Sequence, residues 1–378
     1  MRYELQDVVW EITWKCNANC MHCGSDCISV EKQNELTTAE CLDVVADLKQ
    51  LGTKRIFLAG GDPLVRKDFA AIAGAIKSHG MDVSFISNGL ALDDDTLAVI
   101  KAIGPIAFGM SLDAGDAYMH DYIRGRKGCF DKVISNIKRL QENGITVSIV
   151  TTIHKLNYSQ LIKIRDILLE TGVKYWQVQY AAFIGRMPAE AMVTEAQFWE
   201  MAKFILDTKT NYADRIDLTG ADVTGYMSDF AMMLQGRWYG CQAGMKVLGI
   251  GSDGSVRGCL SQQFDRFIEG NVREKSLIEI WNDPKAFEYN RHFDCSMLTG
   301  YCKTCPYAAL CKGGCTVAST AREGCRCNPY CLYKIEKEGF SDEYQARCEF
   351  SAEEIAQLYN PIRELPKEFY EKYSPNFI

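Results

Sequence analysis

Short apolar runs alternate along the first half of the chain with stretches in which apolar residues recur at helical spacing. The strand-like runs lie at 8–14, 55–59, 82–87, 106–112, 145–152 and 174–180. Between them the pattern predicts helices near 38–51, 67–79, 92–103, 130–143 and 158–171. Strands that alternate with helices indicate an α/β fold with a parallel sheet. Six such units do not complete the eight of a full barrel.

Helix-capping signals support several of these boundaries. Thr37 and Glu40 have the spacing of a capping box, and Gly52 ends the helix that follows. The side chain of Asn157, with Gln160, is predicted to cap the helix at 158–171. A further helix is expected from Glu195 to Asp207, and residues 211–237 are interpreted as a connector with helical content. The strand and helix alternation stops near residue 232.

Composition describes an ordinary globular protein. Of the 378 residues 47% are hydrophobic, which allows a sizeable core. The N-terminus lacks a charged segment followed by an apolar one, and no run approaches the ~18 apolar residues of a membrane span. We therefore expect a cytoplasmic protein. A net charge of -7 without basic runs argues against nucleic acid or an anionic membrane as the main partner.

Seventeen cysteines and five histidines favour thiolate metal sites. In a cytosolic chain many cysteines indicate metal ligation more than disulfides. Three lie in one loop after the first strand, and eleven fall between Cys241 and Cys348. Cys27, Cys41 and Cys129 are scattered elsewhere.

The first cysteine group is Cys16, Cys20 and Cys23, directly after the first predicted strand. Three soft thiolates on one loop can hold three irons of a cubane cluster and leave the fourth open. The spacing resembles that of the radical S-adenosylmethionine superfamily. The resemblance implies that these cysteines are catalytic, that the open iron binds S-adenosylmethionine, and that the fold is a partial (β/α)6 TIM-like barrel. A zinc knuckle or a redox pair is the alternative, and His22 is read as a flanking residue.

Loops at other strand ends resemble the cofactor-binding segments of that superfamily. Gly60-Gly61-Asp62-Pro63 stands where the superfamily has Gly-Gly-Glu-Pro, which holds the ammonium of S-adenosylmethionine. Asp62 is one methylene shorter than glutamate, so backbone contact is the alternative to carboxylate contact. The remaining expected contacts are Ser87 and Asn88, then Ser111 and Asp113 near ribose, and Arg124 at the cofactor carboxylate. Gly185 and Arg186 are expected near adenine and the substrate mouth.

The C-terminal cysteines resemble the SPASM pattern of auxiliary iron-sulfur clusters. Gly254 precedes Cys259 by five residues, and Ser276 and Glu279 open a capped helix between the two halves of the pattern. The seven cysteines that match are Cys241, Cys259, Cys302, Cys305, Cys311, Cys315 and Cys331. Four-thiolate zinc sites remain the alternative, because spacing alone does not separate them from clusters.

The resemblance implies two auxiliary [4Fe-4S] clusters with separate ligand sets. We call Cys241, Cys259 and Cys315 the first auxiliary site. The second auxiliary site consists of Cys302, Cys305, Cys311 and Cys331. The first auxiliary site lacks an obvious fourth ligand. The alternatives for that position are Cys295, Cys325, Cys327 or no protein ligand at all. Cys348 is read as a buried free thiol.

These features predict a barrel domain at 1–232, a SPASM domain at 233–350 and a helical tail at 351–378. The expected activity is cleavage of S-adenosylmethionine to a 5'-deoxyadenosyl radical that abstracts a substrate hydrogen. Modification of a ribosomally made peptide, by crosslinking, epimerisation or oxidation, is the first hypothesis. The start of the cysteine loop at residue 16 leaves no room for a fused leader-binding domain, so a separate leader-binding protein is expected.

Rival functions differ in substrate or in class. Leu260 stands where sulfatase-maturing enzymes have a catalytic aspartate, which disfavours that activity. A small-molecule enzyme of cofactor or natural-product biosynthesis is the alternative, and an electron carrier without enzymatic activity is a third. The enzyme hypotheses require a one-electron reductant such as flavodoxin or ferredoxin.

Overall fold

One curved sheet organises the protein. The computed structural model describes residues 3–27, 34–221, 225–235 and 238–339. Within them the sheet has 10 strands in the order β10-β9-β8-β1-β2-β3-β4-β5-β6-β7. The strands are β1 Asp7–Thr13, β2 Arg55–Gly60, β3 Asp82–Ser87, β4 Ala107–Ser111, β5 Val147–Ile153, β6 Tyr175–Tyr180, β7 Asp217–Gly220, β8 Val247–Ile250, β9 Ser255–Arg257 and β10 Gly270–Asn271.

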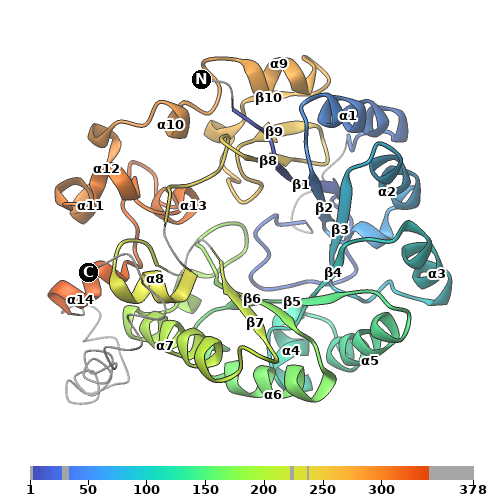
Figure 1. Ribbon diagram of the computed structural model, residues 1–378, viewed down its shortest axis with the longest axis horizontal. Helices are drawn as coiled ribbons and strands as arrows, with labels where there is room; N and C mark the ends of the chain where they lie inside the picture. The colour runs from blue at the N-terminus through green and yellow to red at the C-terminus, as the bar shows by residue number, and fades with distance from the viewer. Residues whose placement is uncertain (1–2, 28–33, 222–224, 236–237, 340–378) are drawn as a thin grey trace.

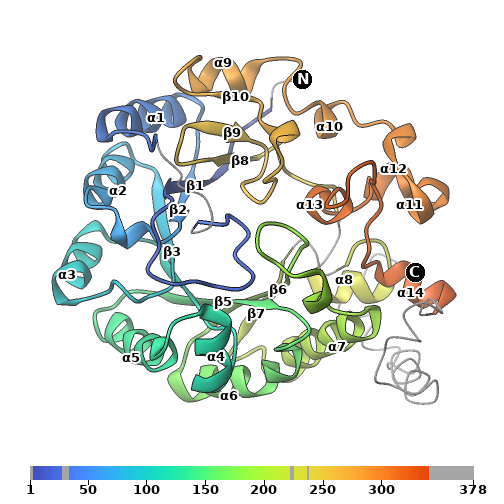
Figure 2. The ribbon, with the colours of Figure 1, turned by 180° about the vertical axis from the view of Figure 1, so that it is seen from behind.

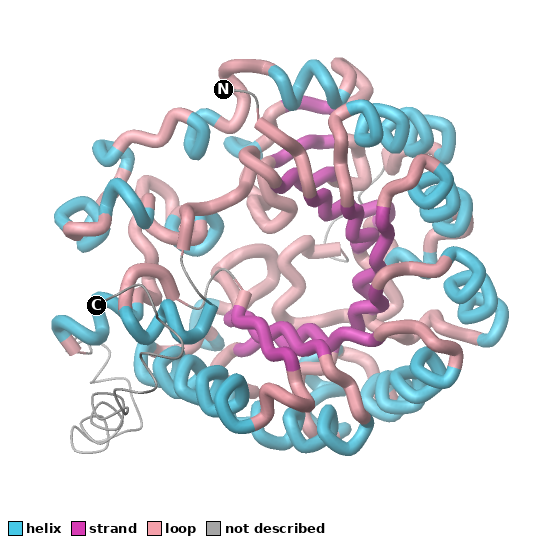
Figure 3. Tube along the Cα trace, viewed as in Figure 1, coloured by secondary structure: helices cyan, strands magenta, loops and turns pink. Residues whose placement is uncertain are grey.

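Neighbouring strands from β1 to β7 are all parallel. β8 pairs parallel with β1 on its other side, and β9 and β10 continue the sheet antiparallel. The sheet therefore curves like part of a barrel and leaves one side without strands (Figure 3). The carboxyl ends of the parallel strands meet at one rim, where such folds place their ligands.

Helices cover the outer face of the sheet (Figure 1). Those of the barrel are α1 Thr38–Gln50, α2 Phe69–Ser78, α3 Asp94–Ile103, α4 Ala117–Arg124, α5 Cys129–Glu142, α6 Leu161–Thr171, α7 Glu195–Asn211 and α8 Asp229–Gln235. Short helices follow in the cysteine-rich part: α9 Leu277–Asn282, α10 Glu288–Arg291, α11 Gly300–Thr304, α12 Ala308–Cys311, α13 Thr316–Ser319 and α14 Leu332–Glu338. Among the described residues no helix is both long and apolar enough to cross a membrane.

The six predicted strands and the helices between them are confirmed, and the α/β partial barrel with them. The interpretation of 211–237 as a helical connector was wrong in part, because Asp217–Gly220 forms β7 beside β6. Four residues are too few to show a period-2 pattern, so their pairing depends on the neighbouring strand. The short helix α4 was also missed.

Predicted helix caps were right at two positions and wrong at a third. Thr37 with Glu40 and Ser276 with Glu279 form reciprocal capping boxes. Asn157 does not cap a helix. Its buried side chain donates to the carbonyls of Asp113 and Thr152 and accepts from His154 N, so it joins two strand ends instead.

A continuous core joins the barrel to the cysteine-rich part. Trp10, Ile12 and Leu58 from the barrel share one buried apolar cluster with Leu248 and Phe287. The sheet and this core both cross the predicted boundary near residue 232. The predicted tail at 351–378 and Cys348 lie outside the described residues.

Candidate active site

The loop that carries Cys16, Cys20 and Cys23 follows β1 and crosses the open rim of the barrel (Figure 2). It lies against the last turn of α4: Asn19 N donates to Arg124 O at 2.9 Å, and Met21 N donates to Ile123 O at 3.0 Å. These backbone bonds use carbonyls that the helix end leaves free. The loop is thus fixed by main-chain contacts and not only by its own sequence.

A second loop, after β6, closes on the other side of the cysteine loop. Arg186 N donates to Cys23 O at 3.0 Å, and its Nη2 donates to Cys20 O at 2.7 Å. Gly185 has φ +56°, and a Cβ there would lie 2.3 Å from Cys23 O. Only glycine allows this close approach of the two backbones. The expected place of this segment near adenine and the substrate mouth stays a prediction, and its observed contacts hold the cysteine loop in position.

Hydrogen-bond donors surround the sulfur atoms of the loop. Cys16 Sγ accepts from Ala18 N at 3.4 Å and from Asn88 Nδ2 at 3.6 Å, and Cys20 Sγ accepts from Arg124 Nη1 at 3.5 Å. Donors of this kind stabilise the thiolate charge of iron-sulfur ligands. Burial raises the pKa of the free Cys16 thiol to about 11, so binding a cluster there must release a proton.

Cys27, which the sequence did not single out, lies beside this group. Its Sγ is 4.0 Å from that of Cys23. The hydrogen bond between Cys23 and Cys27 lowers the pKa of Cys23 to about 5, which favours the thiolate form. Among the described residues no three or more His, Cys, Asp or Glu side chains converge as the ligands of a single ion do. One loop with three thiols and hydrogen-bond donors directed at two of the sulfur atoms fits a cluster.

The Gly60-Gly61 turn lies directly beneath the cysteine loop. Gly61 N donates to Thr13 O at 2.8 Å, and Asp62 N donates to Lys15 O at 2.9 Å. A Cβ on Gly60 or Gly61 would lie 2.2 Å from a carbonyl oxygen of Thr13 or Lys15. The glycines therefore allow the strand end and the loop base to touch.

The Asp62 carboxylate is fully buried and directed inward. Its Oδ1 accepts from Leu64 N, just after Pro63, at 3.0 Å. Its Oδ2 accepts from Ser87 Oγ at 2.7 Å and Asn88 N at 2.8 Å. Burial raises the pKa of this carboxyl, and the three hydrogen bonds oppose the rise. Asp62 thus fixes the ends of β2 and β3 together, and both of its carboxylate oxygens are occupied by internal hydrogen bonds.

A buried ion pair joins β4 to α4. Asp113, wholly buried, meets Arg124 Nη2 at 2.7 Å and accepts from Thr152 N at 2.9 Å. Burial opposes ionisation of Asp113, but the Arg124 guanidinium and nearby histidines hold its pKa below the ordinary value. Ser111, half-buried, ends β4 on the same rim. The structure brings the predicted Asp113 and Arg124 together, and Arg124 also reaches Cys20.

His22 is more deeply placed than its reading as a flanking residue suggested. Its side chain is 8% exposed, and its Nε2 lies 3.5 Å from Asp113 Oδ2. Burial lowers the pKa of His22 to about 4, so the ring is neutral at pH 7. Its Nδ1 is buried without a hydrogen-bond partner among the described residues. In the sequence, only its position between Cys20 and Cys23 indicated that His22 lies near the site.

The four cysteines of the second auxiliary site line one small cavity, together with Tyr226 and Tyr301. Burial raises the pKa of Cys331 to about 11 and that of Cys311 to about 12. The thiol of Cys327 is hydrogen-bonded to Cys302, which lowers the pKa of Cys327 to about 6. The four-thiol donor set around one cavity fits a cluster. Cys327 therefore lies with this group and not with the first auxiliary site.

Two cysteines of the first auxiliary site lie around Tyr289. Its hydroxyl donates to Gln262 Oε1 at 2.9 Å. The same Gln262 oxygen also accepts from Cys259 N at 3.0 Å. Burial raises the pKa of Tyr289, and the Cys241 and Cys259 thiols raise it further. Cys315 precedes α13, beside Tyr226. Cys295 and Cys325 are exposed.

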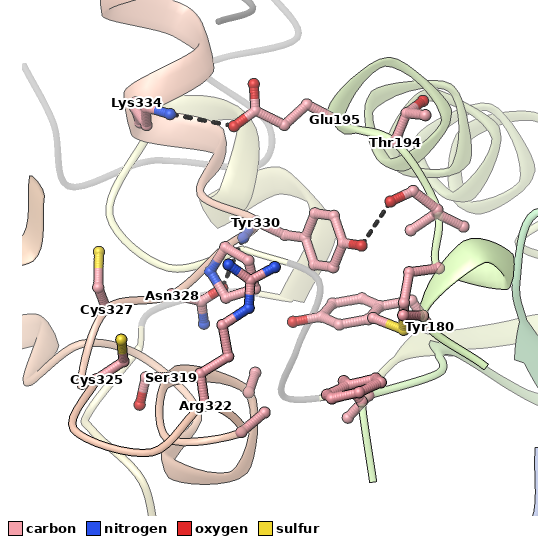
Figure 4. Close-up of a pocket in the computed structure, with 18 of the residues that line it drawn as sticks. Tyr180, Thr194, Glu195, Ser319, Arg322, Cys325, Cys327, Asn328, Tyr330 and Lys334 are labelled. Atoms are coloured by element: carbon pink, nitrogen blue, oxygen red, sulfur yellow. Dashed lines mark hydrogen bonds and ion pairs between the residues drawn. The ribbon is translucent and has the colours of Figure 1, made fainter. Parts of the chain in front are cut away.

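A cavity of about 1050 Å³ opens between the barrel and the cysteine-rich part (Figure 4). Tyr180 and Phe183 line it from the end of β6, and Arg322 and Tyr330 line it from the opposite side. Tyr330 Oη donates to Val193 O, which fixes the two walls to each other. The barrel wall continues directly into the loop of Gly185 that contacts the cysteine loop. The cavity lining thus includes the residues just before this loop, but none of the described residues of the cysteine loop itself.

Two protein families match the chain. Residues 10–168 match the radical SAM superfamily, and residues 241–306 match SPASM, an iron-sulfur cluster-binding domain. The chain is a radical S-adenosylmethionine enzyme of the SPASM subgroup. S-adenosylmethionine and [4Fe-4S] clusters are accordingly its cofactors. Which residue fills each role remains a prediction from the motifs and the geometry.

Relatives of this radical S-adenosylmethionine enzyme act on different substrates. The chain is 27% identical over 347 residues to the AdoMet-dependent heme synthase of Methanosarcina barkeri. The alignment covers 87% of this chain and 97% of that protein. The chain is 26% identical over 336 residues to the mycofactocin maturase MftC of Mycolicibacterium smegmatis, covering 82% and 78%. The structure of Streptococcus suis SuiB bound to its precursor peptide SuiA superposes with a TM-score of 0.70 at 19% identity, covering 87% of this chain and 75% of SuiB.

Proposed function

We propose that this enzyme modifies a peptide by radical chemistry in the cavity between its two parts. The cavity of about 1050 Å³ carries the proposal, because it lies at the upper end of the ~300–1,000 Å³ typical of small-molecule sites and has room for several residues of a peptide. Exposed Lys155, Glu190 and Arg322 line it, so it opens to solvent. An extended chain can therefore enter from outside and present one residue to the barrel rim. The peptide-bound SuiB structure is compatible with this arrangement.

The cofactors supply the radical. When bound, the reduced cluster donates one electron that splits S-adenosylmethionine into methionine and a 5'-deoxyadenosyl radical, which takes a hydrogen atom from the substrate. Cys16, Cys20 and Cys23 are the proposed ligands of that cluster. Flavodoxin or ferredoxin is the proposed electron source, and a separate leader-binding protein is proposed to deliver the peptide.

The protein's own side chains position and shield that reaction. The Gly60-Gly61 backbone is proposed to receive the cofactor ammonium, with Asp62 holding Ser87 and Asn88 behind it. Arg124 and Asp113 fix the rim of β4 and are proposed to lie near the cofactor carboxylate and ribose. His22 Nδ1, which lacks a partner among the described residues, is proposed to bond a polar group of the bound cofactor.

Anaerobic incubation with S-adenosylmethionine, dithionite and candidate precursor peptides tests the proposal. Mass spectrometry should show a change in peptide mass that depends on the enzyme. The variant Arg322→Gln alters the cavity wall without touching the cysteine loop, and it should lower peptide conversion while leaving slow, peptide-free 5'-deoxyadenosine formation unchanged. Conversion that is equal in Arg322→Gln and wild type would exclude this cavity as the peptide site.

A small-molecule substrate is the second candidate. The alignment spans 97% of the heme synthase of Methanosarcina barkeri, which supports this alternative. The aromatic side chains of Tyr180, Phe183 and Tyr330 would pack against a flat ligand. An iron porphyrin added to the protein provides the test, because binding would shift its absorption bands. Turnover of the porphyrin, with no mass change in any peptide, would favour this candidate.

A further inference from the structure

Glu35 holds the base of the cysteine loop, although no sequence motif includes it. Its side chain is half-buried, and its Oε1 accepts two hydrogen bonds, from Thr13 Oγ1 at 2.8 Å and from Trp14 N at 2.7 Å. Thr13 Oγ1 in turn accepts from Lys15 N at 3.1 Å. One carboxylate oxygen thus orients, directly or through Thr13, the three residues that precede Cys16.

The carbonyl groups of the same loop base are bonded to the turn that begins with Gly60-Gly61. Thr13 O accepts from Gly61 N at 2.8 Å, and Lys15 O accepts from Asp62 N at 2.9 Å. The register of β1 on β2 shifts before Thr13, so the regular ladder of the sheet is interrupted there. The direction in which the chain leaves the sheet is therefore set by these carbonyl bonds together with Glu35.

The cysteine-rich part fixes Glu35 itself. Arg273, between β10 and α9, donates from Nη1 to Asn34 O at 2.8 Å and from Nη2 to Glu35 O at 3.1 Å. Leu36 N donates to Ser252 O at 2.7 Å. Three consecutive residues of this segment are thus bonded through their backbone to residues more than two hundred positions away. The carboxylate of Glu35 is presented to the loop base by a segment that is itself held in place.

The two ends of the cysteine loop are held by different contacts. Main-chain bonds to α4 and the bonds from Arg186 hold the part that carries Cys20 and Cys23. Cys16 follows Lys15 directly, so its place depends on the loop base. A cubane cluster needs its ligand sulfur atoms at set separations, and displacement of this end alone would disturb the whole ligand set.

We infer that Glu35 is a positioning residue of the candidate active site, whose carboxylate holds the loop base where Cys16 can bind the cluster together with Cys20 and Cys23. A carboxylate accepts hydrogen bonds more strongly than a neutral group does, which suits it to hold an amide and a hydroxyl at once. The inference rests on the proposed ligand role of the three cysteines, and it is independent of the substrate.

The test uses the full chain and no substrate. Glu35→Ala removes the acceptor, whereas Glu35→Gln keeps an oxygen that can accept the same two bonds. Glu274→Ala removes an exposed carboxylate next to Arg273 and is the matched control. Amide hydrogen exchange, measured on the protein without clusters, reports directly on the bond from Trp14 N. Iron analysis after anaerobic reconstitution reports on the cluster.

Glu35→Ala should speed exchange of the Trp14 amide by about ten- to a hundredfold, because a hydrogen bond to a carboxylate is lost. It should also lose most of the about four irons that replacement of Cys16, Cys20 and Cys23 by Ala removes. Glu35→Gln should stay close to wild type in both measurements, and Glu274→Ala should change neither. In the chain that already lacks the three cysteines, Glu35→Ala should remove no further iron, whereas general destabilisation of the fold would.

Full iron content or an unchanged rate of Trp14 exchange in Glu35→Ala would overturn the inference, and so would equal loss of iron in Glu35→Gln. If replacement of the three cysteines removes no iron, the proposed ligands are rejected and the inference with them. If circular dichroism shows that Glu35→Ala is unfolded, Arg273→Ala decides, because it releases the segment that carries Glu35. Faster Trp14 exchange with lower iron content then supports the role, and unchanged values reject it.

Discussion

At the scale of single residues, buried polar groups at the barrel rim hold each other in place. Asp113 and Arg124 are the clearest pair, with a 2.7 Å contact and little exposure on either side chain. Such a pair adds modest net stability, but removal of one partner leaves a buried charge. Asp62 belongs to the same class, because its two oxygens accept three internal hydrogen bonds. The consequence is measurable in the stability of the folded chain.

Arg124→Ala should lower the free energy of unfolding by about 3–5 kcal/mol, because it leaves the Asp113 carboxylate buried and unpaired. The double variant Arg124→Ala with Asp113→Ala should recover part of that loss, since no unpaired charge remains. Urea unfolding of the two single variants and the double variant measures the coupling. Strictly additive losses would show that the two side chains do not stabilise each other.

At the scale of elements, glycines at helix ends decide how closely the cysteine loop approaches. Gly125 ends α4 with φ +58°, and a Cβ there would lie 2.4 Å from Asn19 O in the cysteine loop. Gly128 precedes α5 with φ +78°, but a Cβ there meets no atom within 4 Å. An alanine at either position would be strained by the positive φ, but only at Gly125 would its Cβ collide with the cysteine loop.

Gly128→Ala should therefore cost only the left-handed backbone penalty of about 1–2 kcal/mol. Gly125→Ala should cost more, and it should also reduce the iron content at Cys16, Cys20 and Cys23 by displacing the loop. Urea unfolding and iron analysis after anaerobic reconstitution measure both effects. Equal stability and equal iron content in the two variants would mean that contact between α4 and the loop does not position the cysteines.

At the scale of the whole molecule, the cysteine-rich part completes the barrel. β8 pairs with β1 over four residues, from Asp7 with Val247 to Trp10 with Ile250. Ser252 Oγ donates to Glu11 O, and Leu36 N donates to Ser252 O. An unpaired β1 would expose a sheet edge and part of the core.

A chain that ends at residue 232 should therefore not fold cooperatively, although the strand and helix alternation stops there. The expected result is a weak near-ultraviolet circular dichroism signal and association in solution, while the full chain unfolds in one transition. A monomeric, cooperative 1–232 fragment would establish residue 232 as the end of an independent domain.

Although the two parts share one sheet and core, the second auxiliary cluster should be removable on its own. Replacing Cys302 and Cys305 by Ala should reduce the iron content from about twelve to about eight per chain, because one of three cubanes loses its ligands. Substrate-free formation of 5'-deoxyadenosine should persist, and product should fall to background. Cys41→Ala, a buried position outside the cysteine groups, is the control.

Circular dichroism must show that the Cys302 and Cys305 variant is folded, since loss of metal can unfold a small domain. Product formation by a folded variant with about eight irons would make the second auxiliary site purely structural. Loss of 5'-deoxyadenosine formation in that folded variant would mean that cleavage also depends on this cluster.

The sequence by itself determined the six strands from β1 to β6, the helices predicted between them and the spacing of the cysteines. These are local properties: a period of 2 or 3.6 residues, a capping box such as Thr37 with Glu40, and three thiols on one short loop need no distant partner. The six strands from β1 to β6 follow from such patterns. The missed elements include β7 to β10 and α4, which have eight residues or fewer and show no clear period of their own.

Only the tertiary structure decided which side chains serve the site and which support it. Asp62 is directed to Ser87 and Asn88, His22 is buried beside Asp113, and Asn157 joins two strand ends. In each case the partner lies far away in sequence or depends on how a loop is held. The same reason applies to β8, which completes the sheet beside β1 across more than two hundred residues, because pairing between distant strands leaves no periodic trace in either segment.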